Sequence, residues 1–184
     1  MTRGVGIVTA ICVAAGLLAG CSTTPTTSEE KNELSRKAQA ERQEWGKLDP
    51  GIEELAKKSQ GFAFFPEITK GGLVFGGAYG RGVVYEQGQL IGYADVTQAS
   101  FGLQAGGQTY SELIVFQDKA ALDRFKQNRT DFGANASAII AKTGAAANAR
   151  FVDGVAVFVR PTAGAMAEAS VGGQRMTYVA GSPR

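Results

Sequence analysis

The stretch of sequence that decides the fold covers residues 70–85 and reads KGGLVFGGAYGRGVVY. Alternate side chains of a β-strand point to opposite faces, so one face of this stretch is bulky, with Phe75 and Tyr79, and the other is small throughout. Glycine weakens a strand unless a bulge, a bend or a close approach needs it. We therefore expect a backbone or a large ring to pack tightly against the small face, with a bend near residues 76–77 or near residue 80. The structural glycines of this strand pair are Gly71, Gly72, Gly76, Gly77, Gly80 and Gly82.

A nucleotide-binding loop is the alternative explanation for these glycines, and their spacing excludes it. A dinucleotide fingerprint reads G-x-G-x-x-G at the turn into a helix, and a P-loop reads G-x-x-x-x-G-K-[ST]. Gly80 and Gly82 are followed by the strand-like residues 83–85 without a third glycine, and Lys70 precedes the glycines instead of following them. Neither phosphate-binding motif is present in this stretch.

Further strand patterns surround the glycine-rich stretch. Residues 62–65 form a short apolar run that Pro66 is expected to end, because proline cannot donate to a sheet. Short turns with glycine or asparagine separate many of the later runs, and strands do not alternate regularly with helices. The pattern favours an α+β fold, with a curled antiparallel sheet that is sandwich-like or barrel-like and flanked by a few helices. The later runs cover residues 89–96, 99–104, 112–116, 151–159 and 165–179.

Three helices are predicted from their caps. Thr27 and Glu30 fit a capping box before a polar helix whose thin apolar stripe is Leu34, Ala38 and Trp45. This helix can pack on the domain or lie on a membrane, and the thin stripe favours packing. Glu33 and Lys37 form an i,i+4 pair on its outer side. Residues 49–58 form a second helix, capped by an aspartate that precedes a proline, and residues 118–125 form a third, with Leu122 and Phe125 facing inward.

The N-terminus indicates export and lipid attachment. Arg3 precedes an uncharged apolar run, which is shorter than the roughly 20 residues needed to span a bilayer. Residues 18–21, LAGC, resemble a bacterial lipobox, in which the Cys21 thiol receives a diacylglyceryl group and becomes the first residue of the mature chain. We therefore expect a signal peptide at residues 1–20, a flexible tether at 21–28 and a single domain at 29–184. Ser22 resembles an outer-membrane sorting signal, which predicts a lipid-anchored protein of the bacterial envelope on the periplasmic face of the outer membrane.

Composition narrows the function. Removal of Arg3 with the signal leaves 18 of the 19 basic residues against 17 acidic ones. This near-neutral balance argues against nucleic-acid binding, which requires a basic excess. The chain has no histidine, and its two cysteines are Cys12 in the signal and Cys21, so the usual zinc ligands and the commonest general base are missing. We expect neither a metal nor another cofactor, and no enzymatic activity.

An ordered series of motifs resembles the SYLF lipid-binding domain family. The motifs are GFAFFP at residues 61–66, KGG at 70–72, FGGAYGRGV at 75–83 and SFGLQAG at 100–106. A weaker similarity continues to Gly172, Gly173 and Tyr178. The resemblance implies a β-rich α+β domain that binds membrane phospholipids, often with help from an amphipathic N-terminal segment. Some fungal members bind actin, but the lipobox points to a bacterial envelope, where actin is not expected.

Three function hypotheses follow from these features. The first is an envelope lipoprotein whose domain binds membrane phospholipids; the lipid-headgroup candidates Lys57, Lys58, Lys70 and Arg81 bracket the family motif. The second is a lipid-anchored protein-interaction or structural module without headgroup recognition. The third is an enzyme using carboxylates with a hydroxyl group, and no spacing favours it. Its candidate residues are Asp95, Glu112 and Asp153 with Ser100 or Tyr79.

Overall fold

The computed structural model describes residues 24–72, 75–101, 107–129, 138–163 and 174–181. The helices are α1 (Ser28–Leu48), α2 (Pro50–Lys58), α3 (Lys119–Lys126) and the short 3-10 helix η1 (Ala146–Asn148). The strands are β1 (Gly61–Gly72), β2 (Phe75–Glu86), β3 (Gln89–Phe101), β4 (Gly107–Phe116), β5 (Ile139–Ile140), β6 (Val155–Ala163) and β7 (Gln174–Ala180).

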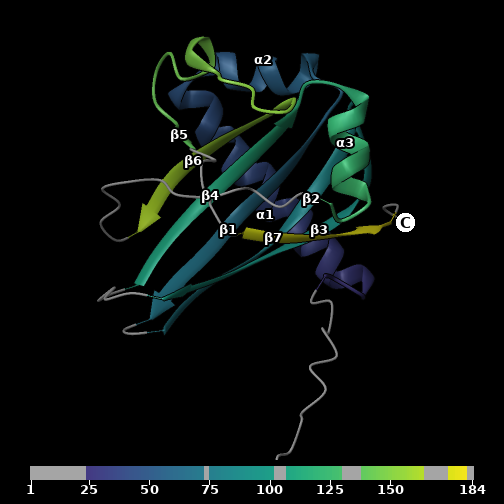
Figure 1. The fold of residues 1–184 in the computed structure, drawn as a ribbon, viewed down its shortest axis with the longest axis vertical. Helices are drawn as coiled ribbons and strands as arrows, with labels where there is room; N and C mark the ends of the chain where they lie inside the picture. The colour runs from purple at the N-terminus through teal and green to yellow at the C-terminus, as the bar shows by residue number, and fades with distance from the viewer. Residues whose placement is uncertain (1–23, 73–74, 102–106, 130–137, 164–173, 182–184) are drawn as a thin grey trace, which may run out of the picture.

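The strands form one open sheet with the order β5-β6-β4-β1-β2-β3-β7. Neighbouring strands are antiparallel, except that the two-residue strand β5 runs parallel to β6. Figure 1 shows α1 behind the long strands and α3 in front of them, beside β7. The structure confirms the α+β fold with a curled sheet, and the single parallel pair makes that sheet mixed instead of purely antiparallel.

The curl brings together strands that are far apart in the sheet order. The side-chain amide of Gln174 on β7 donates to Glu112 Oε2 on β4 at 3.1 Å, although β1, β2 and β3 separate the two strands. The concave interior thus formed is apolar at one end, where Leu122 and Phe125 of α3 pack against Phe116. The alternate side chains of the same strands form a second core on the convex face, under α1 and α2.

Helix α1 packs on this convex face. Thr27 caps it in a capping box with Glu30, as predicted, and Leu34, Ala38 and Trp45 are all buried against the sheet. The Trp45 indole meets the Phe64 ring edge-on, with 5.8 Å between ring centroids. The prediction that α1 docks on the domain is therefore confirmed, and its outer face carries the expected Lys37–Glu33 ion pair at 3.1 Å.

A polar network fixes α1 at its middle. Arg160 of β6 donates two hydrogen bonds to the Glu41 carboxylate, from Nε at 2.7 Å and from its terminal nitrogen at 2.6 Å. Ser111 of β4 donates to the same carboxylate at 2.6 Å, and the Trp45 indole N–H donates to Ser111 Oγ at 2.9 Å. Charge-assisted, two-pronged bonds of this kind set geometry as well as adding energy. They hold the helix across β4 and β6, because each partner comes from a different element.

The second helix is tied to η1 through its cap. Asp49 Oδ1 accepts from the Gly51 backbone N–H at 3.0 Å, as expected of an N-cap, and Oδ2 accepts from the Ala146 N–H at 2.9 Å. Both carboxylate oxygens are used, which explains why this aspartate is buried.

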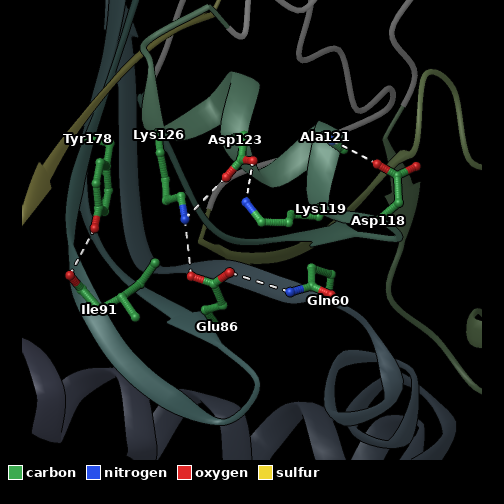
Figure 2. Close-up of polar contacts among 9 residues, drawn as sticks. All are labelled: Gln60, Glu86, Ile91, Asp118, Lys119, Ala121, Asp123, Lys126 and Tyr178. Carbon is green, nitrogen blue, oxygen red and sulfur yellow. Dashed lines mark hydrogen bonds and ion pairs between the residues drawn. The ribbon is translucent and has the colours of Figure 1, made fainter.

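Helix α3 closes the other face, and its polar contacts are drawn in Figure 2. Asp118 caps it by accepting from the Ala121 N–H at 2.8 Å, and the Lys126 ammonium lies between Glu86 of β2 at 3.1 Å and Asp123 at 3.3 Å. Burial alone would lower the pKa of Lys126, but the bonds to Glu86 and Asp123 outweigh it and raise the pKa. The Lys126 ammonium therefore stays charged and links α3 to the sheet.

The edge strand β7 is tied to its surroundings at Tyr178. Its hydroxyl donates to the Ile91 carbonyl at 2.9 Å (Figure 2), and its backbone N–H donates to Asn128 Oδ1 at 2.6 Å, just after α3. Asn128 adopts a positive φ of 57°, a conformation that asparagine tolerates better than most residues. The segment that follows α3 thus covers one outward backbone donor of the sheet edge.

The prediction that Pro66 ends its strand was wrong. Strand β1 continues to Gly72, and the register shifts between Phe64 and Glu67, where Phe65 and Pro66 together oppose the single residue Gly82. A β-bulge of this kind leaves one residue outside the hydrogen-bond ladder, so a proline is accommodated there without losing a bond.

Other strand boundaries also differ from the prediction. The run predicted at residues 89–96 and residues 99–101 of the next run form one strand, β3, and residues 102–104 lie outside the described residues. Strand β4 begins five residues before its predicted start, at Gly107. Residues 151–154 form a turn with positive φ at Asp153 and Gly154, so β6 begins only at Val155. Strand β7 begins at Gln174, and residues 164–173 of the predicted run lie outside the described residues.

The network around Glu41 makes a stability prediction. The substitution Arg160→Met keeps the aliphatic stem but leaves a partly buried carboxylate without its charged donor, which should cost about 2 kcal/mol of unfolding free energy. Arg175→Met, at an exposed position of β7, is the control and should change it by less than about 0.5 kcal/mol. Urea unfolding measures both. Equal losses in the two variants would show that the network does not stabilise α1.

Candidate functional site

Two of the six glycines of the opening stretch allow the bulge to form. A Cβ at Gly82 would lie 2.7 Å from the Phe65 ring and 2.8 Å from the Phe64 carbonyl oxygen. A Cβ at Gly80 would lie 2.6 Å from Ile68 Cγ1 and 2.7 Å from the Glu67 carbonyl oxygen. These distances are below any ordinary contact, so β1 can close on β2 only where side chains are absent.

The remaining glycines lie in the looser part of the strand pair. Gly71 pairs with Gly77 and Gly72 with Gly76 in the β1–β2 register. A Cβ at Gly71 would meet nothing within 4 Å, and one at Gly77 would meet only the Gln98 carbonyl oxygen, at 3.3 Å. The register stays regular beside these residues and shifts opposite Gly82. The irregularity expected near residues 76–77 or 80 therefore lies at Gly82.

This end of the sheet is poor in charge. Four neighbouring strands contribute residues 68–72, 75–80, 96–101 and 107–110, and Lys70 is the one charged residue among them. The sheet register places Lys70 between Ala78 of β2 and Gln108 of β4. Within the described residues Lys70 makes no ion pair, and these four segments contain no carboxylate. A cation without a counter-charge on a neutral surface can accept an external anion.

Exposed, uncharged side chains cross the same end of the sheet on the face opposite to Lys70, because alternate residues of a strand point to opposite faces. Thr69, Tyr79 and Thr97 are cross-strand partners on β1, β2 and β3, and all three are exposed. Tyr79 retains 40 % of its surface. The row of glycines beyond them adds no side chains.

Arg81 lies beside this surface, in a groove under the first turn of α1. The groove has a volume of about 180 Å³ and is lined by Tyr79, Arg81 and Thr69 of the sheet and by Glu30 and Lys37 of the helix, among others. Glu30 Oε1 is 3.7 Å from the Arg81 guanidinium. Hydrogen bonds from the backbones of Thr27 and Thr26 lower the pKa of Glu30, which keeps it ionised. Arg81 therefore already has an anionic partner.

Lys57 and Lys58 lie away from this region. They end α2, where Lys57 is 3.5 Å from Glu53 and Lys58 is 3.2 Å from Glu54. Strand β1 begins three residues later, and Gly61 and Lys70 are about 30 Å apart along it at roughly 3.3 Å per residue. The four headgroup candidates thus do not form one cluster. Lys70 and Arg81 lie towards one end, and Lys57 and Lys58 towards the other.

The residues considered for catalysis do not assemble either. Glu112 is fully buried on the concave face, Asp95 is buried on β3 opposite Arg81, and Asp153 is exposed in the turn before β6. The Ser100 side chain lies outside the described residues. No group of acidic residues in the described ranges has the arrangement of a metal site.

Sequence reasoning missed the helix side of the groove. Glu30 is recognisable as the third residue of a capping box, but its second role beside Arg81 depends on how α1 crosses the sheet. It also missed that Thr24 and Pro25 are buried, so these two residues pack on the domain before α1 begins. Neither the Glu30–Arg81 contact nor the burial of Thr24 and Pro25 can be predicted from a local sequence pattern, because both depend on tertiary packing.

Part of the chain matches a known family. Residues 97–179 match the model of the family described as Ysc84, Las17-binding protein actin regulator, which is the SYLF family that the motifs indicated. The matched range runs from the end of β3 through β7, and the glycine-rich pair β1–β2 precedes it. The family is known for lipid and actin binding and is not a family of enzymes. No curated protein matches the chain.

Within the described ranges, no helix is long and apolar enough to cross a bilayer.

The glycine contacts predict different outcomes at two positions. Gly82→Ala should destabilise the fold by about 2 kcal/mol or more, because the new Cβ overlaps the Phe65 ring and the Phe64 carbonyl oxygen. Gly71→Ala meets no neighbour and should change stability by less than about 1 kcal/mol. Thermal unfolding of both variants checks this. If Gly71→Ala is the more damaging of the two, the bulge is not the site of close packing.

Proposed function

We propose that this chain, which carries a domain of the SYLF family, is a lipid-anchored protein of the bacterial envelope that binds phospholipid membranes through the sheet end around Lys70. The observation that carries the proposal is the charge pattern of this surface. Lys57, Lys58 and Arg81 each have a carboxylate partner, whereas Lys70 has none among the described residues. A lysine or arginine near an anionic bilayer contributes about 1 kcal/mol to the free energy of membrane binding. A lysine or arginine that is already paired with a carboxylate contributes less.

The short distance to Cys21 supports the same orientation. Thr24 is buried, and three residues of extended chain reach at most about 10 Å. An acyl group on Cys21 would therefore hold the α1 end of the domain close to the bilayer. The first turn of α1 lines the groove that Thr69 also lines, at the same end of the sheet as Lys70, whose side chain points to the other face. The anchor and Lys70 would then lie at the same end of the domain, while Lys57 and Lys58 lie farther away.

The exposed side chains of Thr69, Tyr79 and Thr97 support a second candidate function. An exposed, uncharged sheet face can also receive a protein, in which case the domain is a lipid-anchored interaction or structural module. That function predicts binding that does not depend on vesicle charge. It is distinguished from lipid recognition by the first experiment below.

Charge reversal tests the lipid surface. The chain from Ser22 onward, which lacks the acyl group, should sediment at low salt with vesicles containing phosphatidylglycerol and much less with phosphatidylcholine alone. Lys70→Glu should weaken this binding about tenfold or more, because one attraction is replaced by one repulsion. Lys58→Glu is the matched control and should have a small effect. Unchanged binding by Lys70→Glu would reject this surface, and no binding by the unaltered chain would favour the protein-interaction module.

Removal of the acylation site tests the anchor. Cys21→Ala in the full chain should abolish labelling by radioactive palmitate in bacterial cells and release the protein from the membrane fraction, because the acyl chains supply ~0.8 kcal/mol per buried CH2. Outer and inner membranes separated on a density gradient would then locate the unaltered protein. Palmitate labelling that persists in the variant would contradict acylation at Cys21.

A further inference from the structure

One polar contact crosses the inside of the curled sheet. The Gln174 amide nitrogen donates to Glu112 Oε2 at 3.1 Å and to the Tyr110 hydroxyl oxygen at 3.3 Å. Glu112 is 0 % exposed and Gln174 is 1 % exposed. The register places Glu112 between Phe65 of β1 and Val159 of β6, and both of these neighbours are buried. A carboxyl group is thus enclosed by apolar side chains, with a neutral amide as its bonded partner.

Two oxygen atoms of this contact lack a donor. Within the described residues, neither Glu112 Oε1 nor Gln174 Oε1 accepts a hydrogen bond. A buried acceptor without a donor is costly, and a buried carboxylate without a cation is more so. Both deficient atoms belong to one pair of side chains that already shares an N–H···O bond, and a single additional proton is a donor that both can use.

We propose that Glu112 is a protonated carboxylic acid in the folded chain and that its O–H donates to Gln174 Oε1, so that acid and amide form a two-bond latch between β4 and β7. The proton comes from solvent and returns to it when the acid ionises. The ionised form keeps the N–H···O bond but leaves a negative charge in the apolar interior. The latch is therefore closed by a proton and weakened by its loss.

The surroundings of Glu112 support this protonation state. Tyr110 is the titratable group that faces it among the described residues, and it is neutral at physiological pH, because burial and the nearby Glu112 raise the Tyr110 pKa. Phe65 and Val159 flank the carboxyl group, and Gln174 is uncharged. Burial raises the pKa of Glu112 to about 7, and the Gln174 bond opposes this only in part.

The orientation of the Gln174 amide does not remove the need for a proton. Amide oxygen and nitrogen are assigned from their contacts, and turning the amide over would place its oxygen opposite Glu112 Oε2. A hydrogen bond between these two oxygen atoms requires a protonated carboxyl group, because an ionised carboxylate and an amide oxygen are both acceptors.

The latch gives the domain a defined pH dependence. The pKa of a glutamate in an unfolded chain is about 4.3, and the folded value is higher, so the folded chain binds the proton more tightly. The contribution to stability is complete below about pH 4.3 and is lost as the pH rises towards about 7. Strand β7 is at the edge of the sheet and pairs with β3 alone. Ionisation of Glu112 therefore most directly weakens the contact between Gln174 of β7 and the interior of the sheet.

Unfolding the full chain in urea at several pH values tests the latch. Between about pH 5 and pH 7 the unfolding equilibrium constant of the unaltered chain should rise by up to about tenfold per pH unit through Glu112, the linkage of one proton. Glu112→Gln should lack this component, because an amide cannot ionise and two facing amides can form the same pair of hydrogen bonds. Glu67→Gln, at an exposed position of β1, is the control and should retain the pH dependence. If Glu112→Gln shows the same pH dependence as the unaltered chain, the latch is rejected.

A second measurement does not depend on the folding of a variant. Infrared difference spectroscopy of the full chain, between mildly acidic and alkaline pH, should detect the carbonyl band of a buried protonated carboxyl group that is lost as the pH rises through about 7. The absence of that band at mildly acidic pH would show that Glu112 is ionised in the folded chain and would overturn the proposal.

Discussion

Two residues of the central strand β1, Phe65 and Pro66, occupy the length of sheet that the single residue Gly82 occupies on β2. This bulge shifts the alternation of side chains, so that Phe65 and Ile68 belong to the same core although they are three residues apart. A bulge also bends its strand and increases the local twist. Because β1 lies in the middle of the sheet, the bend acts on strands at both sides and helps to bring β4 and β7 across from each other. The interior core, the Glu112–Gln174 contact and the convex surface under α1 all depend on this curvature.

The features that could be predicted from the sequence are local ones. The caps at Thr27, Asp49 and Asp118, and the buried side of α1, depend on residues within a turn or two of each other, and the structure contains them as expected. The bulge was not predicted, because a proline normally ends a strand. It is accommodated here only because Gly82 lies opposite it on the neighbouring strand, and that register is not known from the sequence. The Glu41–Arg160 contact joins residues 119 positions apart, and no periodicity announces it.

The candidate site shows the same division between local and tertiary information. Four cations could be selected from the sequence because they bracket a family motif, but their availability depends on acidic neighbours. Glu53 and Glu54 form ion pairs with Lys57 and Lys58 within a single helix, and the i,i+4 spacing of these residues in the sequence already allows this pairing. Glu30 of α1 forms an ion pair with Arg81 of β2. Lys70 differs from the other three because its cross-strand neighbours in the folded sheet are the uncharged residues Ala78 and Gln108.

The Asn128 side chain has a consequence for how copies of this protein meet. An edge strand exposes backbone donors and acceptors that can pair with another edge, and repeated pairing leads to filaments or aggregates. Asn128 Oδ1 occupies the outward N–H of Tyr178, so an incoming strand would have to displace a bond that is already made. One asparagine after α3 therefore opposes lateral pairing of β7 with the sheet edge of another copy of the chain.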